Sequence, residues 1–480
     1  MPDDVLKPNA LKPNSLKPNS TAARDVAWHL HGYTNAARHE VTGPLVIVRG
    51  QGVRVFDEDG RDYIEGLAGL WCTALGFDET RLADVAAEAM RRLPFYHTFG
   101  HKTHPAVVDL AEKLIALAPQ TPHGDFSKVF FANSGSEAND TALKIVRYYN
   151  NALGRPEKKK IISRDKAYHG VTLATAGLTG LPANHRDFDL PLDFIRHTGC
   201  PHHYRFAEPE ESPEQFASRR AEELEKLILA EGPDTVAAMF AEPVMGAGGV
   251  IVPPPTYFEK IQAVLRKYDI LLIADEVICG FGRTGTAWGS ETYGMKPDML
   301  ACAKMLSSGY LPISALLISE PIYQAIKDNS GRIGTFGHGF TYGGHPVAAA
   351  VALETLKIYA DRDILGHVQA VGPHMQARLR ALAAHPLVGE ARGVGLIGAL
   401  EIVADKATKA PFDPPGGMGL RAVAACQDVG VICRAMGDTI AFAPPLIISE
   451  AEIDQLFDRV ETALNALLSQ LRAEGKFTPD

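Results

Sequence analysis

Residues 270–275 read Ile-Leu-Leu-Ile-Ala-Asp, an apolar run that ends in a carboxylate. The run does not alternate polar and apolar side chains, which is typical of a strand covered on both faces. A second run of this kind, Met299–Ala303, ends in Lys304. Ligands of open α/β sheets bind where the strands end, so these two runs predict an acid and an amine at one sheet edge.

Further apolar runs extend this pattern along the middle of the chain, at Lys128–Ala132, Lys160–Ser163, Thr235–Ala241 and Ile313–Ser319. Helical periodicity lies between them, at 137–150, 213–230 and 257–268. The alternation of strands and helices predicts an α/β domain with a mostly parallel sheet.

The two ends of the chain have other patterns. Residues 44–63 alternate Val, Ile and Phe around a turn, which predicts a β-meander. Helical patterns at 345–360, 365–384 and 450–472 flank a strand at 395–401. We therefore expect a large domain over residues 81–345 and a small α+β domain assembled from residues 23–80 and 346–480.

Residues 1–22 form a low-complexity tail. Leu-Lys-Pro-Asn occurs three times between residues 6 and 19, with a period of five. Proline in each copy disfavours both helix and sheet, and the period is too short for a solenoid repeat. We expect a disordered tail, and a docking peptide is the alternative.

Composition excludes several classes of protein. The 480 residues carry a net charge of -9 without a long basic run, which argues against nucleic-acid binding. No apolar stretch approaches the ~20 residues of a membrane span, and the N-terminus lacks a secretory signal pattern. The 6 cysteines contain no C-x-x-C pair, so neither a disulfide scaffold nor a zinc ribbon is expected. A cytoplasmic protein with no membrane partner is the expectation.

A loop that suits phosphate follows the strand at 128–132. Asn133-Ser-Gly-Ser-Glu137 opens a helix, so the backbone N–H groups of Gly135 and Ser136 can bind an anion there. Ser134 and Glu137 also match a capping box, which needs no ligand.

The carboxylate of Asp275 and the amine of Lys304 suit a cofactor bound beside this loop. A lysine at the end of a buried strand is desolvated, which favours the neutral amine that Schiff-base chemistry needs. Asp275 can face the ring nitrogen of a pyridine cofactor. Alternatively, Lys304 reaches solvent and Asp275 caps a turn. Acid, amine and phosphate loop together fit pyridoxal phosphate (PLP).

Two other motifs are weaker. Gly393-Val-Gly-Leu-Ile-Gly398 matches a dinucleotide fingerprint, but it leads into a strand rather than a helix. His97, His101 and His104 cluster in sequence, yet Gly100 and Pro105 interrupt the helix that would align them as metal ligands. We therefore expect neither NAD nor a metal.

With these motifs the sequence resembles the class III pyridoxal-phosphate aminotransferases, and among them the amine:pyruvate (ω-) transaminases, over about residues 25–472. The motifs that carry the resemblance are Gly69-Leu-Trp-Cys72, Asn133–Glu137, Ala167-Tyr-His-Gly170, Ala241–Gly249, Ala274–Gly285, Ala303-Lys-Met-Leu-Ser-Ser-Gly309 and Gly339–Pro346. The resemblance implies PLP fold type I, the aspartate-aminotransferase fold, and a homodimer or larger assembly with shared active sites.

The resemblance also implies roles for single residues at the cofactor. Lys304 would form the Schiff base and move the substrate proton, and Asp275 would pair with the pyridinium nitrogen. The other implied cofactor contacts are Gly135 and Ser136 at the phosphate, Thr341 at the phosphate of the neighbouring subunit, Tyr168 and Val277 on the two ring faces, and Glu242 beside the ring.

On the substrate side the resemblance implies aromatic walls and one cation. Trp71, Phe99 and Tyr168 would line the pocket, with Ala247 and Ile278 as smaller wall residues. Arg434 would bind the carboxylate of the keto acid bidentately. A salt bridge at a domain interface is the alternative role for Arg434.

The expected reaction is ping-pong transfer of an amino group from a primary amine to pyruvate, giving alanine and a ketone or aldehyde. Another class III PLP enzyme, such as a β-alanine, taurine or diamine transaminase, an aminomutase or a racemase, is the alternative. A catalytically inactive binding protein of this fold is disfavoured, because Lys304 and Asp275 are both present.

Overall fold

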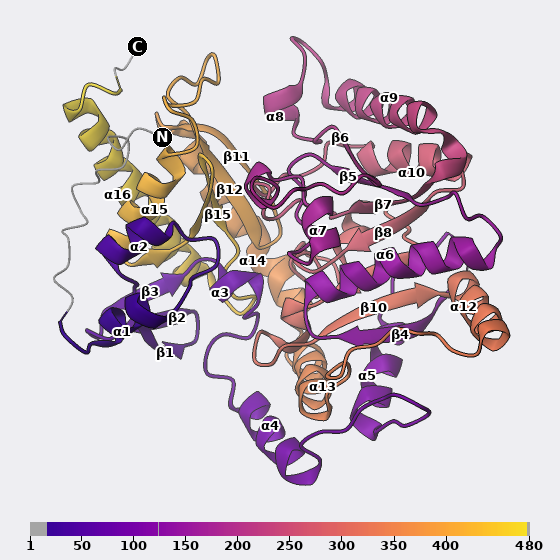
Figure 1. Cartoon of the computed structure of the whole chain (residues 1–480). Helices are drawn as coiled ribbons and strands as arrows, with labels where there is room; N and C mark the ends of the chain where they lie inside the picture. Colours follow the sequence, from indigo (N-terminus) through magenta and orange to yellow (C-terminus); the bar gives the residue numbers. More distant parts are fainter. Residues whose placement is uncertain (1–16, 123, 478–480) are drawn as a thin grey trace.

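The computed structural model describes residues 17–122 and 124–477, which form a large α/β part and a smaller α+β part (Figure 1). The core of the large part is a seven-stranded sheet with the order β4-β10-β9-β8-β7-β5-β6. Strand β10 runs antiparallel to both of its neighbours, β4 and β9, and the other neighbouring pairs in this sheet are parallel. The strands are β4 (Phe126–Ala132), β5 (Lys160–Arg164), β6 (Ile195–Thr198), β7 (Val236–Ala241), β8 (Leu271–Asp275), β9 (Met299–Cys302) and β10 (Ser314–Ser319).

Helices cover both faces of this sheet, which explains why its strands are apolar throughout. In β8, Ile273 belongs to the apolar cluster under α6, whereas Leu272 packs into the cluster under α9 and α10. The helices of this part are α4 (Thr80–Arg92), α5 (Pro105–Ala116), α6 (Gly135–Ala152), α7 (Leu173–Leu178), α8 (His203–Phe206), α9 (Pro213–Glu231), α10 (Tyr257–Lys267), α11 (Gly289–Thr292), α12 (Glu320–Ile333) and α13 (Pro346–Asp361).

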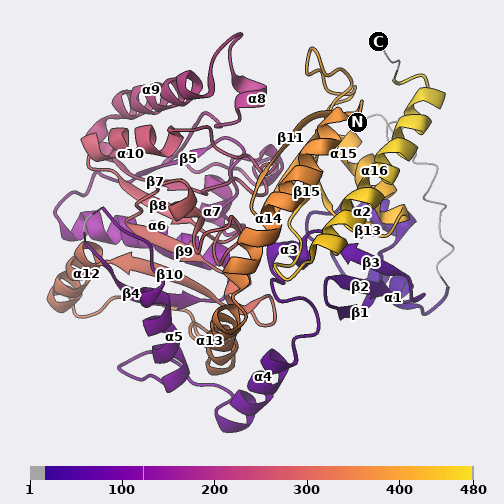
Figure 2. The same ribbon diagram turned by 180° about the vertical axis from the view of Figure 1, so that it is seen from behind.

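The smaller part joins the two ends of the chain. Strand β3 pairs in parallel with β13, which places Ile64 opposite Val431. One sheet contains β1 (Ile47–Gln51), β2 (Arg54–Asp57), β3 (Asp62–Glu65) and β13 (Val431–Ile432), and the other contains β11 (Val388–Val394), β12 (Ile397–Ile402), β15 (Thr439–Phe442) and β14 (Arg434–Met436). Figure 2 shows α14 (Ile364–Ala381), α15 (Met418–Asp428) and α16 (Glu450–Ala473) beside these sheets.

Helix α13 departs from the expected domain division. The division at residue 345 assigns it to the small domain, but the helix packs mainly against α4 and α5. Its buried Val351 and Leu356 belong to the same apolar cluster as Leu110 and Leu114 of α5. By packing, the large part therefore extends through α13, because an apolar helix follows the surface that covers it rather than its sequence neighbours.

The N-terminal segment is helical earlier than expected. Helix α1 (Thr21–Trp28) begins inside the predicted tail, and Ser20 caps it by accepting a 3.1 Å hydrogen bond from the Ala23 N–H. The loop after it leads to α2 (Ala36–Thr42), and α3 (Ala68–Trp71) follows the first sheet. The first two Leu-Lys-Pro-Asn copies lie outside the described residues.

The sequence argued against a dinucleotide site at Gly393–Gly398 and against a membrane span, and the fold bears on both points. Gly393 and Gly398 face each other in the β11–β12 hairpin, so these glycines do not open a helix as a dinucleotide site requires. Within residues 17–122 and 124–477, none of the helices has the length and apolar character needed to cross a membrane.

Candidate active site

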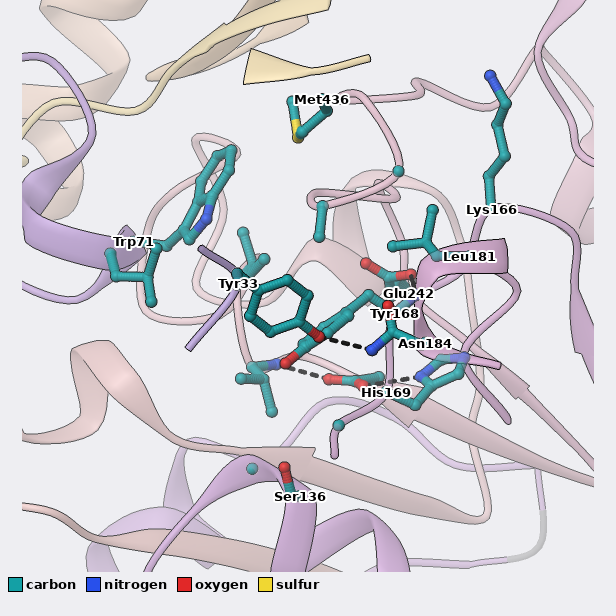
Figure 3. Close-up of a pocket in the computed structure, with 18 of the residues that line it drawn as sticks. Tyr33, Trp71, Ser136, Lys166, Tyr168, His169, Leu181, Asn184, Glu242 and Met436 are labelled. Carbon is teal, nitrogen blue, oxygen red and sulfur yellow. Dashed lines mark hydrogen bonds and ion pairs between the residues drawn. The ribbon is translucent and has the colours of Figure 1, made fainter. Parts of the chain in front are cut away.

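A cavity of about 570 Å³ lies where the large sheet meets the smaller part (Figure 3). Asp275 ends β8, Lys304 follows β9, and the first turn of α6 follows β4. Their convergence follows from the neighbouring strands ending at one sheet edge. The predicted site residues that line the cavity are Trp71, Gly135, Ser136, Tyr168, Glu242, Asp275, Val277, Lys304 and Arg434, together with Ala247 and Ile278.

Asp275 is buried and its carboxylate orientation is fixed by three donors. Its Oδ2 accepts hydrogen bonds from Asn139 Nδ2 at 2.7 Å and His169 Nδ1 at 2.8 Å. Its Oδ1 accepts from the Val277 N–H at 3.1 Å. His169 Nε2 has no hydrogen-bond partner among the described residues. The carboxylate is therefore held in one geometry at the cavity floor.

Lys304 combines backbone strain with a desolvated amine. Its φ is 49°, in the left-handed region that costs energy for a residue with a Cβ. Burial lowers the pKa of Lys304, and the nearby acids Asp275 and Glu242 only partly oppose this shift. A lowered pKa enriches the neutral, nucleophilic form of the amine.

Glu242 fixes a loop that forms one cavity wall. Its two carboxylate oxygens accept hydrogen bonds from the N–H groups of Tyr168 and Gly246, each at 3.0 Å. Burial raises the pKa of this carboxyl. The loop it holds carries Ala247 and Gly248 into the cavity lining.

The start of α6 is only half of a capping box. Ser134 Oγ accepts from the Glu137 N–H at 3.2 Å, but Glu137 Oε2 accepts from the Asn133 N–H instead of reaching Ser134. Gly135 lies directly under Val277, and a Cβ at Gly135 would be 2.9 Å from a Val277 methyl. The N–H groups of Gly135 and Ser136, which have no partner within the helix, stay available to an anion.

Aromatic side chains and one cation form the other end of the cavity. The Tyr33 ring lies edge-on to Tyr168, with 6.5 Å between centroids, and Tyr33 Oη accepts from Asn184 Nδ2 at 2.6 Å. The Arg434 Cζ is 5.9 Å from the Tyr33 centroid. Within the described part of the chain, no carboxylate forms an ion pair with Arg434, so the interface salt bridge is not formed.

Phe99 and Thr341 are not brought to this cavity by their own chain. Phe99 is 46% exposed and packs over Gly339, in a separate depression. Thr341 is exposed two residues further on. Phe99 therefore does not line the cavity of its own chain, and its place in a pocket shared between subunits stays a prediction. The resemblance assigned Thr341 to a neighbouring subunit, and its exposure is compatible with that role.

Two of the histidines at residues 97–104, His97 and His104, make other contacts in this fold. His104 caps α5 by accepting from the Val107 N–H at 3.3 Å, and its Nε2 donates to the Gly344 carbonyl at 2.8 Å. His97 stacks on Tyr96. Among the described residues, neither His97 nor His101 belongs to a group of possible metal ligands.

The structure adds site residues that the sequence did not single out. His169 follows Tyr168 directly in the sequence. Asn139 follows Gly135 by one helical turn, which places Gly135 and Asn139 on one face of α6. In the sequence, these two spacings are what could have pointed to His169 and Asn139 as site residues. Tyr33 and Asn184 had no such signal, because they reach the cavity from loops distant in sequence.

Comparison with known proteins fits this geometry. The sequence model of the family Aminotransferase class-III matches residues 35–464. The chain belongs to the class-III aminotransferases. It is 53% identical over 423 residues to gamma-aminobutyrate transaminase 1, mitochondrial, of Oryza sativa subsp. indica, covering 88% of this chain and 81% of that protein. It is 53% identical over 421 residues to gamma aminobutyrate transaminase 3, chloroplastic, of Solanum lycopersicum, covering 88% and 80%.

Solved structures of class-III relatives share the fold. The omega transaminase from Pseudomonas jessenii in complex with PMP superposes with a TM-score of 0.92 at 54% identity, covering 94% of this chain and 99% of that one. A thermostable engineered omega transaminase gives a TM-score of 0.91 at 55% identity, covering 93% and 99%. This chain is therefore a PLP-dependent aminotransferase of fold type I.

The residues present fit PLP. The phosphate matches the free N–H groups of the first turn of α6, and the pyridine nitrogen matches the Asp275 carboxylate. The contact of Gly135 with Val277 leaves room only for a backbone without a side chain.

This cradle predicts the effect of Gly135→Ala. The added methyl would meet Val277 at 2.9 Å, so we expect PLP affinity to fall about tenfold, measured by absorbance titration of apoenzyme. Gly331→Ala is the control, because a Cβ there meets nothing within 4 Å. An unchanged affinity in Gly135→Ala would show that the close contact does not shape the site.

Proposed function

We propose that this aminotransferase is an amine:pyruvate (ω-) transaminase, which converts a primary amine and pyruvate into a ketone or aldehyde and alanine. The observation that carries the proposal is Arg434, which has no acidic partner among the described residues, in a cavity whose lining includes Trp71, Ile278 and Met436. The guanidinium suits the single carboxylate of pyruvate. Trp71, Ile278 and Met436 suit an amine with no charged group besides the amine.

The cofactor end of the cavity supports this chemistry. PLP, when bound, supplies the electron sink for the bond broken at the amine carbon. Asp275, fixed by Asn139 and His169, would hold the positive ring nitrogen in place. The first turn of α6 would bind the phosphate, and Tyr168 and Val277 would keep the ring in its plane.

Lys304 is the residue we assign to proton transfer. Its lowered pKa increases the share of neutral amine, the form that can accept a proton. It would take the proton from the amine carbon of the donor and return a proton to the carbon that becomes Cα of alanine. The walls formed by Tyr33, Trp71 and Tyr168 would exclude water from these steps.

Gamma-aminobutyrate transamination is a second candidate, since curated relatives carry that name. Gamma-aminobutyrate has a carboxylate distant from its amine, and Arg434 offers a partner for it. Both candidates use the same cofactor residues, so the choice between them depends on the substrate end alone.

A panel of two donors and two acceptors separates the candidates. The donors are 1-phenylethylamine and gamma-aminobutyrate, and the acceptors are pyruvate and 2-oxoglutarate. We expect pyruvate to give at least about tenfold higher kcat/KM than 2-oxoglutarate, because the second carboxylate would enter an apolar wall without a partner. Lys166 lines the cavity, but its Nζ is directed at Phe206, 5.9 Å from the ring centroid. Preference for 2-oxoglutarate with an inert 1-phenylethylamine would overturn the amine:pyruvate assignment.

We also propose that two chains form each active enzyme. Phe95, Tyr96, Phe99 and Tyr342 are each more than a third exposed, and the Phe95 and Tyr342 rings lie 5.6 Å apart. An exposed aromatic patch of this kind is typical of a protein interface. Pairing over this patch would bring Thr341 and Phe99 toward the site of a second chain. Light scattering that gives the mass of one chain for active enzyme would contradict the proposal.

A further inference from the structure

The N-terminal segment carries a polar cluster that the transamination site does not use. Asp25 lies in α1, His29 caps the C-terminus of that helix, His31 lies in the following loop, and His39 lies in α2. We call these four residues the N-terminal cluster. The loop between the two helices also delivers Tyr33 to the active-site cavity.

The side chains of the N-terminal cluster converge on one carboxylate. Asp25 Oδ2 lies 2.7 Å from His31 Nε2 and 3.0 Å from His39 Nε2. Asp25 Oδ1 lies 3.0 Å from His29 Nδ1. Adjacent imidazole centroids, His29 to His31 and His31 to His39, are 4.4 Å and 4.3 Å apart. Ligand atoms of Asp25, His29 and His31 therefore lie close together, and His39 Nε2 contacts the same carboxylate.

We propose that the N-terminal cluster binds one divalent transition-metal ion, with the three imidazoles and the carboxylate as ligands. Nitrogen and oxygen donors in this ratio suit Zn²⁺, which takes four ligands at ~2.0–2.2 Å in a tetrahedron. Ligand atoms of Asp25, His29 and His31 all lie within 4.8 Å of one another. His39 lies outside this close group, so its side chain would have to rotate toward the other three to complete a tetrahedron.

Access and charge also favour a cation here. The three imidazoles line a surface hollow of about 300 Å³. Within residues 17–122 and 124–477, no lysine or arginine pairs with Asp25, whose ion-pair partners are the three histidines. A neutral imidazole presents a lone pair to the ion when its proton is on the other ring nitrogen. The same geometry would also arise if these residues only formed hydrogen bonds with one another, and a metal-binding measurement distinguishes the two cases.

Binding would tie α1, the loop and α2 together around Tyr33. The ligands lie on both sides of Tyr33 in sequence, and the Tyr33 Oη is fixed at its far end by Asn184. A metal ion in the N-terminal cluster would therefore stabilise the loop that closes one side of the active-site cavity. The metal would lie outside that cavity and take no part in proton transfer.

The test uses full-length holoenzyme treated with a chelator and then dialysed against Zn²⁺, with metal analysis of protein and buffer. We expect one tightly bound Zn²⁺ per chain in the wild type. His31→Asn with His39→Asn should weaken binding at least about 100-fold, since two of four ligands are lost. His101→Asn is the matched control, because this exposed histidine lies outside the N-terminal cluster, and it should bind as the wild type does.

A single substitution at an exposed residue gives a second test that does not depend on the folding of the double variant. The His29 side chain is 65% exposed, so His29→Asn should fold normally and still weaken Zn²⁺ binding about tenfold. Thermal unfolding gives a second readout, in which Zn²⁺ raises the Tm of the wild type more than that of either variant. No bound Zn²⁺, or equal Zn²⁺ binding in wild type and both variants, would overturn the proposal. These readouts do not depend on transaminase activity, so they remain valid whichever amine the enzyme uses.

Discussion

Replacing Lys304 by alanine is expected to lower kcat for amine-to-pyruvate transfer by at least about 10⁴-fold. The change removes both the nucleophilic amine and the base at the reacting carbon, and each contributes orders of magnitude to the rate. The first turn of α6 and Asp275 remain, so PLP should still bind without a covalent bond. Initial rates with 1-phenylethylamine and pyruvate measure the loss, and absorbance spectra of dialysed protein measure retained cofactor.

The control for this change is Lys226→Ala, an exposed lysine on α9, which should keep wild-type activity. Circular dichroism and Tm of Lys304→Ala should match the wild type or exceed it, because the change removes a buried, desolvated amine. Activity of Lys304→Ala within tenfold of the wild type would show that another group transfers the proton, and the assignment of Lys304 would fail.

Replacing Arg434 by alanine is expected to separate the two half-reactions. The pyruvate half-reaction should lose about 100-fold in kcat/KM, which corresponds to about 2.7 kcal/mol for a lost bidentate charged contact. The half-reaction with 1-phenylethylamine should change less than about threefold, since this donor has no carboxylate. Stopped-flow absorbance of each half-reaction, with the other substrate absent, measures the two effects independently.

The Arg434 result also distinguishes the two candidate functions. If gamma-aminobutyrate is the main donor, Arg434→Ala should weaken its half-reaction as strongly as that of pyruvate. Arg434→Lys should recover only part of the pyruvate rate, because an ammonium group lacks the planar fork of guanidinium. Equal losses with pyruvate and with the uncharged amine would contradict a carboxylate-binding role for Arg434.

Much of the large part was predictable because its signals are local. Continuous apolar runs identified β7, β8 and β9, and the parallel order of such strands placed the residues after each run at one edge. Asp275 and Lys304 could therefore be grouped without a structure. Asn139 and His169 lie close to predicted residues in sequence, but their hydrogen bonds to Asp275 depend on loop geometry that no periodicity encodes.

The sequence by itself determined the α/β class, the phosphate loop at the start of α6 and the pairing of an acid with an amine, because strand and helix patterns arise from neighbouring residues. Only the tertiary structure decided that Arg434 faces the cavity with no acidic partner among the described residues, that Phe99 lies outside the cavity of its own chain and that α13 packs on α4 and α5. It also brought Asp25 and His39 together and placed Tyr33 beside Tyr168. These contacts join residues far apart along the chain, and they depend on how apolar surfaces pack rather than on any local pattern.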